Sequence, residues 1–147
     1  MGYQIERQAL VNYSCEQMFA LVNDIEAYPQ YMDGCYEASV LARGENWLEA
    51  RLTLGMAGQK QSFVTRNQLF PPHRMTMGLV DGPFKTFNGD WRFTALGDQG
   101  CKVSLSLDFS LSNPLLGMMV NKMFEKIASA QVDALCLRAR QIYGDGE

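Results

Sequence analysis

Hydrophobic and polar residues alternate through most of the segment from Cys35 to Leu111. A two-residue period of this kind is typical of strands with one buried face and one face in water, as in an antiparallel sheet. The cleanest run ends the segment, where polar residues separate Val103, Leu105, Leu107 and Phe109. Turn signals divide the pattern and, with an alternating start to the chain, predict strands near 3–11, 35–43, 48–56, 61–70, 74–80, 84–96 and 101–111.

A helical period replaces the alternation after the first expected strand. Ser14 and Gln17 form a capping-box pattern ahead of an apolar stripe that includes Phe19 and Val22. The segment Ile25–Tyr31 then predicts a second short helical piece. Two short helices are therefore expected between the first and second strands.

A longer helical pattern lies near the C-terminus, where apolar residues recur at three- and four-residue steps. Asn113 suits the N-cap, Pro114 the first helical position and Gly144 the end. The pattern predicts one helix in the run from Asn113 to Tyr143, with about 29 helical residues between these two ends and a length of roughly 43 Å. A rod of this length needs a large concave partner. The expected fold is α+β, a curved antiparallel sheet of six to seven strands wrapped around the long C-terminal helix, in one domain spanning 1–147.

Composition and charge narrow the classes of partner. Hydrophobic residues make up 47% of the chain and charged residues 20%, as in globular domains. The net charge of −3 gives no overall attraction to DNA. Four cysteines without a CxxC pair argue against a zinc site and favour a reducing compartment. Because the sequence shows neither an apolar leader nor a membrane-spanning run, we expect a cytoplasmic protein.

Catalytic signatures are missing from the sequence, which has no GxSxG elbow, phosphate-binding glycine loop or HExxH pair. The single histidine, His73, follows a Pro-Pro turn with no partner indicated by the sequence. Apolar or tyrosine neighbours of Cys35 and Cys136 favour packing over thiol chemistry. We therefore expect a non-enzymatic protein with no catalytic residue, no metal and no required cofactor.

Apolar side chains of the strands and of the terminal helix are expected to face one another. The chain has nine methionines, whose flexible thioethers adapt to irregular surroundings and favour a cavity for a hydrophobic ligand. A packed core without a ligand is the alternative. Arg66 is a candidate polar anchor, although Phe63 and Val64 are both apolar and leave the inward parity of that strand open. The expected lining consists of Tyr28, Met75, Met77, Phe87, Trp91, Phe93, Leu105, Leu107, Phe109, Met119, Val120, Met123 and Ile127.

Local strings add a resemblance to a known family. Val22–Tyr31, Gly82–Lys85 with the following Gly89–Phe93, and Ser112–Gly117 are similar to signatures of START-like, polyketide-cyclase-like proteins of the helix-grip fold. Within that superfamily the strings resemble the branch of coenzyme-Q-binding proteins and bacterial ribosome-association toxins. The resemblance covers nearly the whole chain and implies the helix-grip architecture.

Two functions follow from this resemblance, and a cyclase-like enzymatic activity is a third alternative that it implies. The first is binding of ubiquinone or a related lipid between the sheet and the C-terminal helix, in support of respiration. The second is binding to the large ribosomal subunit, which blocks subunit joining. A location at the inner membrane suits the first function. A transient membrane contact through Met32 and the helix start at 115–119 is a related hypothesis, with ordinary helix packing as its alternative.

Overall fold

The computed structural model describes residues 2–56, 59–98, 100–111 and 117–144, and the side chains of residues 56, 59 and 117–121 lie outside that description. One antiparallel sheet of seven strands has the order β1-β7-β6-β5-β4-β3-β2. The elements are β1 (Tyr3–Val11), α1 (Cys15–Asn23), the 3₁₀ helix η1 (Ile25–Gln30), β2 (Cys35–Arg43), β3 (Trp47–Met56), β4 (Gln59–Phe70), β5 (Arg74–Asp81), β6 (Phe84–Leu96), β7 (Gly100–Leu111), α2 (Gly117–Ser129) and α3 (Gln131–Tyr143).

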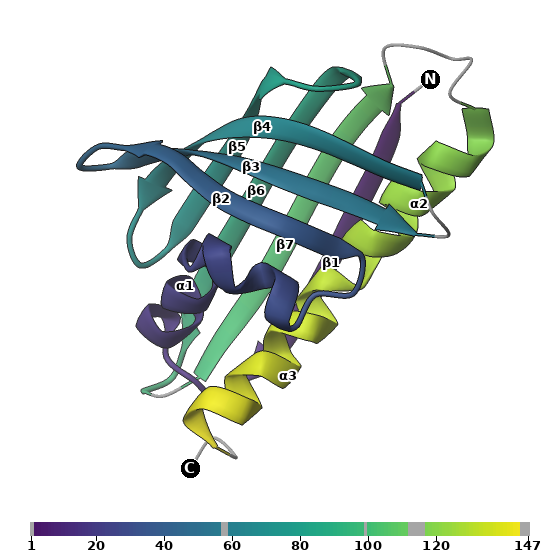
Figure 1. The fold of residues 1–147 in the computed structure, drawn as a ribbon. Helices are drawn as coiled ribbons and strands as arrows, with labels where there is room; N and C mark the ends of the chain where they lie inside the picture. The colour runs from purple at the N-terminus through teal and green to yellow at the C-terminus, as the bar shows by residue number, and fades with distance from the viewer. Residues whose placement is uncertain (1, 57–58, 99, 112–116, 145–147) are drawn as a thin grey trace.

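The sheet is strongly curved (Figure 1). In that view β2, β3 and β4 cross in front of β6, β7 and β1, and α2 and α3 run along the open side of the sheet. The helix α2 contacts β1 at one edge of the sheet and β3 near the other edge. The helix-grip architecture expected from the sequence is confirmed.

The C-terminal helix differs from the single continuous helix that the sequence predicts. Ala130 separates α2 from α3, and its amide donates to the Ile127 carbonyl at 3.2 Å. Three-residue hydrogen bonds of this type tighten the end of a helix. The interruption has a packing consequence, because α2 lies against β1 and β3 whereas α3 lies against α1, β1 and β7. The expected start at Asn113 and Pro114 lies outside the described residues.

Short-range signals position the two elements between β1 and β2. The Ser14 hydroxyl accepts from the Gln17 amide at 3.1 Å, and the Gln17 side chain accepts from the Ser14 amide at 2.9 Å. The predicted capping box is therefore confirmed. Gly34 precedes β2 with φ +88°, and a Cβ at this position would lie 2.7 Å from the Ile127 side chain. Glycine is needed both for the backbone conformation and for the close approach to α2.

The inner face of the sheet forms a closely packed hydrophobic core with the helices. Trp91 is 1% exposed, stacks on Phe93 with ring centroids 6.3 Å apart, and has the fully buried Met75 and Leu105 as strand neighbours. Along β7, the buried residues follow the alternation that the sequence predicts. Trp91 is therefore packed among core residues.

Replacing Trp91 with alanine is expected to lower the free energy of unfolding by about 3–5 kcal/mol, because a large buried ring leaves an unfilled cavity. Urea denaturation followed by circular dichroism measures the change. Leu10→Ala is the matched control, since Leu10 is 72% exposed and its truncation should change stability by no more than about 0.5 kcal/mol. Equal effects of the two substitutions would show that Trp91 does not hold the core together.

Candidate functional site

A small cavity lies between the inner face of the sheet and α2. Its volume is about 40 Å³, enough for one or two water molecules, whereas pockets for organic ligands commonly measure about 300–1,000 Å³. Between the described residues of the sheet and of α2, the interior is thus almost completely filled by side chains. The cavity is lined by Tyr28, Leu52, Leu54, Phe63, Thr65, Met77, Phe84, Phe87, Trp91, Leu107, Phe109, Phe124, Ala128 and Gln131.

A cluster of five phenylalanines occupies most of this interior. Phe84 is at its centre, with ring centroids 4.9 Å from Phe124, 5.0 Å from Phe87 and 5.2 Å from Phe63. Phe109 completes the cluster at 6.0 Å from Phe84. The rings meet in tilted or edge-to-face geometry, which stabilises aromatic pairs beyond the area they bury.

The residues expected to line a ligand cavity fall into three groups. Met75, Phe93, Leu105, Met123 and Ile127 are buried but are not among the residues that line the cavity. The side chains of Met119 and Val120 lie outside the described part of the chain. Those that line it are Tyr28, Met77, Phe87, Trp91, Leu107 and Phe109. Ligand binding by this last group stays a prediction.

The sequence reasoning missed Phe84, Phe63 and Phe124. Phe84 and Phe87 are three residues apart, so strict alternation places them on opposite faces of β6. A register shift between Phe84 and Thr86 turns both rings inward. Phe63 pairs with the inward Leu52, which settles the parity that two adjacent apolar residues left open. Phe124 and Ala128, which also line the cavity, follow Met123 and Ile127 by one position along α2.

Arg66 does not point into the cavity, contrary to the expectation. The register that places Phe63 and Thr65 inside places Arg66 on the outer face of β4, where its side chain is 45% exposed. Its guanidinium lies 4.1 Å from the ring centroid of Trp47 and 3.3 Å from the Glu49 carboxylate. Arg66 is therefore a surface residue held by an aromatic ring and an ion pair.

Few polar groups reach the interior among the described residues. The Tyr28 hydroxyl donates to the Val22 carbonyl, so its proton is unavailable to a ligand, and burial raises its pKa well above the ordinary value. The Thr65 hydroxyl donates to the buried Asn67 amide oxygen at 2.9 Å. Gln131 contributes a side-chain amide at the junction of α2 and α3. This set can orient a ligand but supplies no acid–base pair.

The buried thiols of Cys35 and Cys101 are poor nucleophiles at neutral pH. Burial raises the pKa of Cys35 to about 11, and burial together with the neighbouring Cys15 raises that of Cys101 to about 12. Both groups remain protonated near pH 7, and it is the thiolate that reacts. Their location supports a packing role.

The hypothesis of a membrane contact through Met32 is not supported by its position. Met32 is 4% exposed and belongs to the hydrophobic core, while residues 115–119 lie outside the described side chains. Within the described helices, none is long and apolar enough to cross a membrane. The described residues also hold no group of three or more His, Cys, Asp or Glu side chains placed to bind a metal ion.

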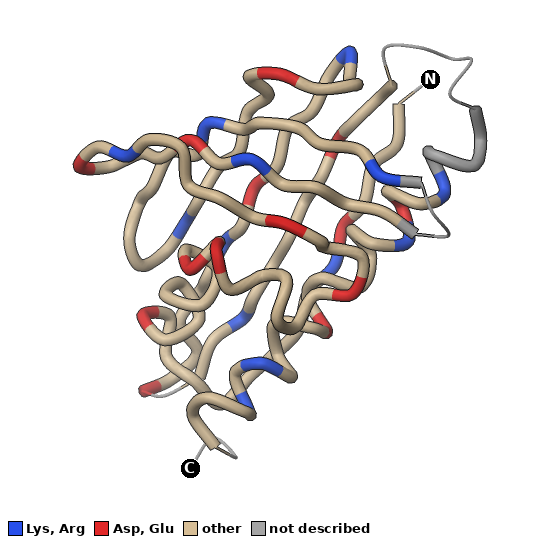
Figure 2. Tube along the Cα trace, in the orientation of Figure 1, with Lys and Arg blue, Asp and Glu red and all other residues tan. Residues whose placement is uncertain are grey.

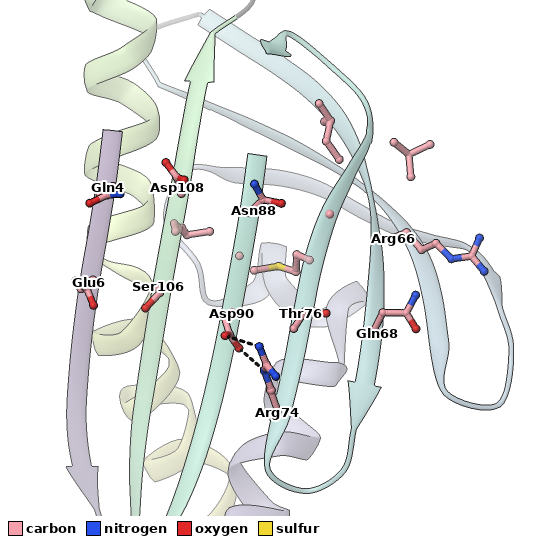
Figure 3. A pocket seen from close by; sticks show the side chains of 16 residues that line it. Gln4, Glu6, Arg66, Gln68, Arg74, Thr76, Asn88, Asp90, Ser106 and Asp108 are labelled. Carbon is pink, nitrogen blue, oxygen red and sulfur yellow. Dashed lines mark hydrogen bonds and ion pairs between the residues drawn. The ribbon is translucent and has the colours of Figure 1, made fainter. Parts of the chain in front are cut away.

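A much larger hollow lies on the outer face of the sheet. This outer groove has a volume of about 750 Å³ and extends over β1, β7, β6, β5 and β4. Figure 3 shows its polar side chains, with Asp90 bonded to Arg74 through both carboxylate oxygens at 3.0 Å. The labelled residues are Gln4, Glu6, Arg66, Gln68, Arg74, Thr76, Asn88, Asp90, Ser106 and Asp108.

Comparisons with known proteins agree with this architecture. The family described as polyketide cyclase / dehydrase and lipid transport matches residues 11–136. The chain is 43% identical over 142 residues to the ribosome association toxin RatA of Vibrio cholerae, covering 97% of this chain and 99% of that protein. It is 24% identical over 143 residues to the mitochondrial coenzyme Q-binding protein COQ10 homolog B of Xenopus laevis, covering 94% of this chain and 58% of that protein.

The fold is also shared with an enzyme. The Zhui aromatase/cyclase from a Streptomyces species superposes with a TM-score of 0.84, covers 97% of this chain and 96% of its own, and is 17% identical. At this identity the likeness concerns the fold alone, because one fold supports many unrelated activities.

Shortening Phe124 to alanine is expected to open the inner cavity. Phe124 is 3% exposed, so its loss should cost about 3–5 kcal/mol of stability and leave an apolar space that binds benzene. Benzene should then raise the melting temperature of the variant but not of the wild type. Phe70→Ala, which removes a ring that is 51% exposed, is the control. A variant as stable as the wild type, with no response to benzene, would contradict the description of a filled interior.

Proposed function

The chain belongs to the polyketide cyclase / dehydrase and lipid transport family, and from this premise we propose that it associates with the ribosome. The observation that carries the proposal is the 43% identity to a ribosome association toxin over nearly the full length of both proteins. The similarity to the coenzyme Q-binding protein is lower and covers a smaller share of that protein. Ribosome association, which the sequence analysis gave as the alternative function, is therefore the first candidate, ahead of ubiquinone binding.

The filled interior favours a protein whose surface, rather than its cavity, carries the function. A cavity of about 40 Å³ excludes a substrate of ordinary size unless the phenylalanine cluster moves. A cyclase-like mechanism would also need converging acid and base groups, and the described lining offers Tyr28, Thr65 and Gln131 as its polar members. Binding is thus the better supported mode of action.

The distribution of charge on the surface indicates how the protein would contact the ribosome. In Figure 2 lysine and arginine residues are scattered among acidic ones over the described chain rather than gathered in one stripe. Arg74 and Arg92 both pair with Asp90, and Arg66 pairs with Glu49. Proteins that follow a nucleic-acid backbone use unpaired cations that replace counterions. The surface therefore favours contact through specific groups over general attraction to phosphate.

As the family resemblance implies, we place the contact on the large ribosomal subunit, where the bound protein hinders subunit joining. Sucrose-gradient sedimentation at low salt tests this proposal, and the purified protein should appear in the 50S fraction. Overproduction should lower the 70S peak and raise the free subunits. The Zhui aromatase/cyclase is a control of matched fold. Absence from the 50S fraction together with a normal 70S peak would reject the proposal.

A hydrophobic ligand is the second candidate, and ubiquinone is the specific ligand that the resemblance implies. The apolar lining of the inner cavity and the 24% identity to a coenzyme Q-binding protein support it. Entry of a quinone ring requires displacement of side chains such as Phe84 and Phe124, which meet at 4.9 Å. The energy of this displacement would reduce the affinity.

A short-chain ubiquinone analogue tests the second candidate by thermal unfolding. At 100 times its Kd, a bound ligand adds about 2.7 kcal/mol of stability, which raises the melting temperature of a chain of this size by about 5–10 °C. Ala128→Leu, which fills the cavity from α2, should abolish the rise. An unchanged melting temperature, with no lipid in an organic extract of the purified protein, would exclude this function.

A further inference from the structure

The floor of the outer groove is built from side chains that lie in rows across five neighbouring strands. One row runs from Gln4 on β1 through Asp108, Asn88 and Gly78 to Arg66 on β4. The next row runs from Glu6 through Ser106, Asp90 and Thr76 to Gln68. Neighbouring strands are about 4.8 Å apart, so each row spans roughly 19 Å. The groove thus offers two parallel lines of hydrogen-bonding groups.

Gly78 makes the hollow in the first row. A Cβ at this position would meet no atom nearer than the Arg66 carbonyl oxygen at 3.9 Å, which is an ordinary contact. The backbone is extended within β5, where a side chain is normally favoured over glycine. Packing and backbone conformation therefore leave room for a side chain at Gly78. The absence of a side chain at Gly78 deepens the groove between Asn88 and Arg66.

Charge is distributed unevenly along the groove. Toward β4 and β5 each arginine that lines the groove has a carboxylate partner, Glu49 for Arg66 and Asp90 for Arg74, and Asp90 also pairs with Arg92. Toward β1 and β7 the carboxylates of Glu6 and Asp108 form no ion pair with any cation in the described part of the chain. They occupy diagonal positions on paired strands, about 7–8 Å apart. This end of the groove therefore carries negative charge that no cation among the described residues balances by an ion pair.

We propose that the outer groove binds a lysine- or arginine-rich segment of a ribosomal protein, with Glu6 and Asp108 receiving its cationic side chains. The inference rests on the proposed ribosome association and names the class of partner. Ribosomal RNA is the competing partner, but its phosphates would approach two carboxylates that form no ion pair within the described part of the chain, and would be repelled. Asn88, Gln68 and Ser106 supply donors and acceptors for the backbone of an extended peptide.

Two variants and one control test the groove on intact ribosomes. Gly78→Trp fills the hollow without a backbone clash, and Glu6→Lys/Asp108→Lys inverts the charge. Each should weaken co-sedimentation with 50S subunits about tenfold or more. Glu37→Lys/Glu45→Lys makes the same change in net charge at exposed positions outside the groove and should bind within about twofold of the wild type. Melting temperatures verify that each variant is folded.

A labelled twelve-residue Lys/Arg-rich peptide and a single-stranded RNA of similar length test the partner class by fluorescence anisotropy. The wild type should bind the peptide in preference to the RNA, and both groove variants should lose peptide binding. If the wild type co-sediments with 50S subunits and the groove variants co-sediment equally well, the groove is not the contact surface, although ribosome association stands. Preference for RNA, or peptide binding that the variants retain, would overturn the inference. If the variants lose peptide binding but the wild type does not co-sediment with 50S subunits, ribosome association is refuted, whereas the groove remains a binding site for a cationic peptide.

Discussion

The helix α2 packs against aromatic residues from several strands of the sheet. This contact holds together the parts of the curved sheet that face one another. The Phe124 ring lies 6.1 Å from Phe63 on β4, 4.9 Å from Phe84 on β6 and 6.2 Å from Phe109 on β7. One helix residue thereby reaches strands from both sides of the curved sheet. Each fully buried phenylalanine contributes about 1.5–3 kcal/mol, so closure of the sheet and docking of the helix are energetically coupled.

The same packing constrains what the fold can do. A helix-grip domain with an open interior can hold a substrate or lipid, and its chemistry depends on the polar groups that face that space. Here the phenylalanine cluster fills the interior to within about 40 Å³. The Tyr28 hydroxyl, which could have met a ligand, instead donates to the Val22 carbonyl. The structure thus supports surface recognition, in agreement with the similarity to ribosome association toxins.

Alternation along the strands connects the inner and outer faces. Where the alternation of β1, β6 and β7 is regular, inward core residues are followed by outward ones, and pairing across five strands aligns outward residues into rows. The rows hold the carboxylates of Glu6 and Asp108 toward β1 and the ion-paired Arg66 on β4. The chain therefore presents a surface with directional charge although its net charge is only −3.

The sequence by itself determined the order of elements, the capping box at Ser14 and the faces of the regular strands, because each depends on residues close together in the chain. It did not determine the inward turn of both Phe84 and Phe87, the outward position of Arg66 or the interruption at Ala130. Each of these depends on a register shift, a pairing between strands or the contacts of a helix with a curved sheet. The volume left inside and the rows on the outer face were decided only by tertiary structure, since they result from how distant strands align and how their side chains fill a shared space.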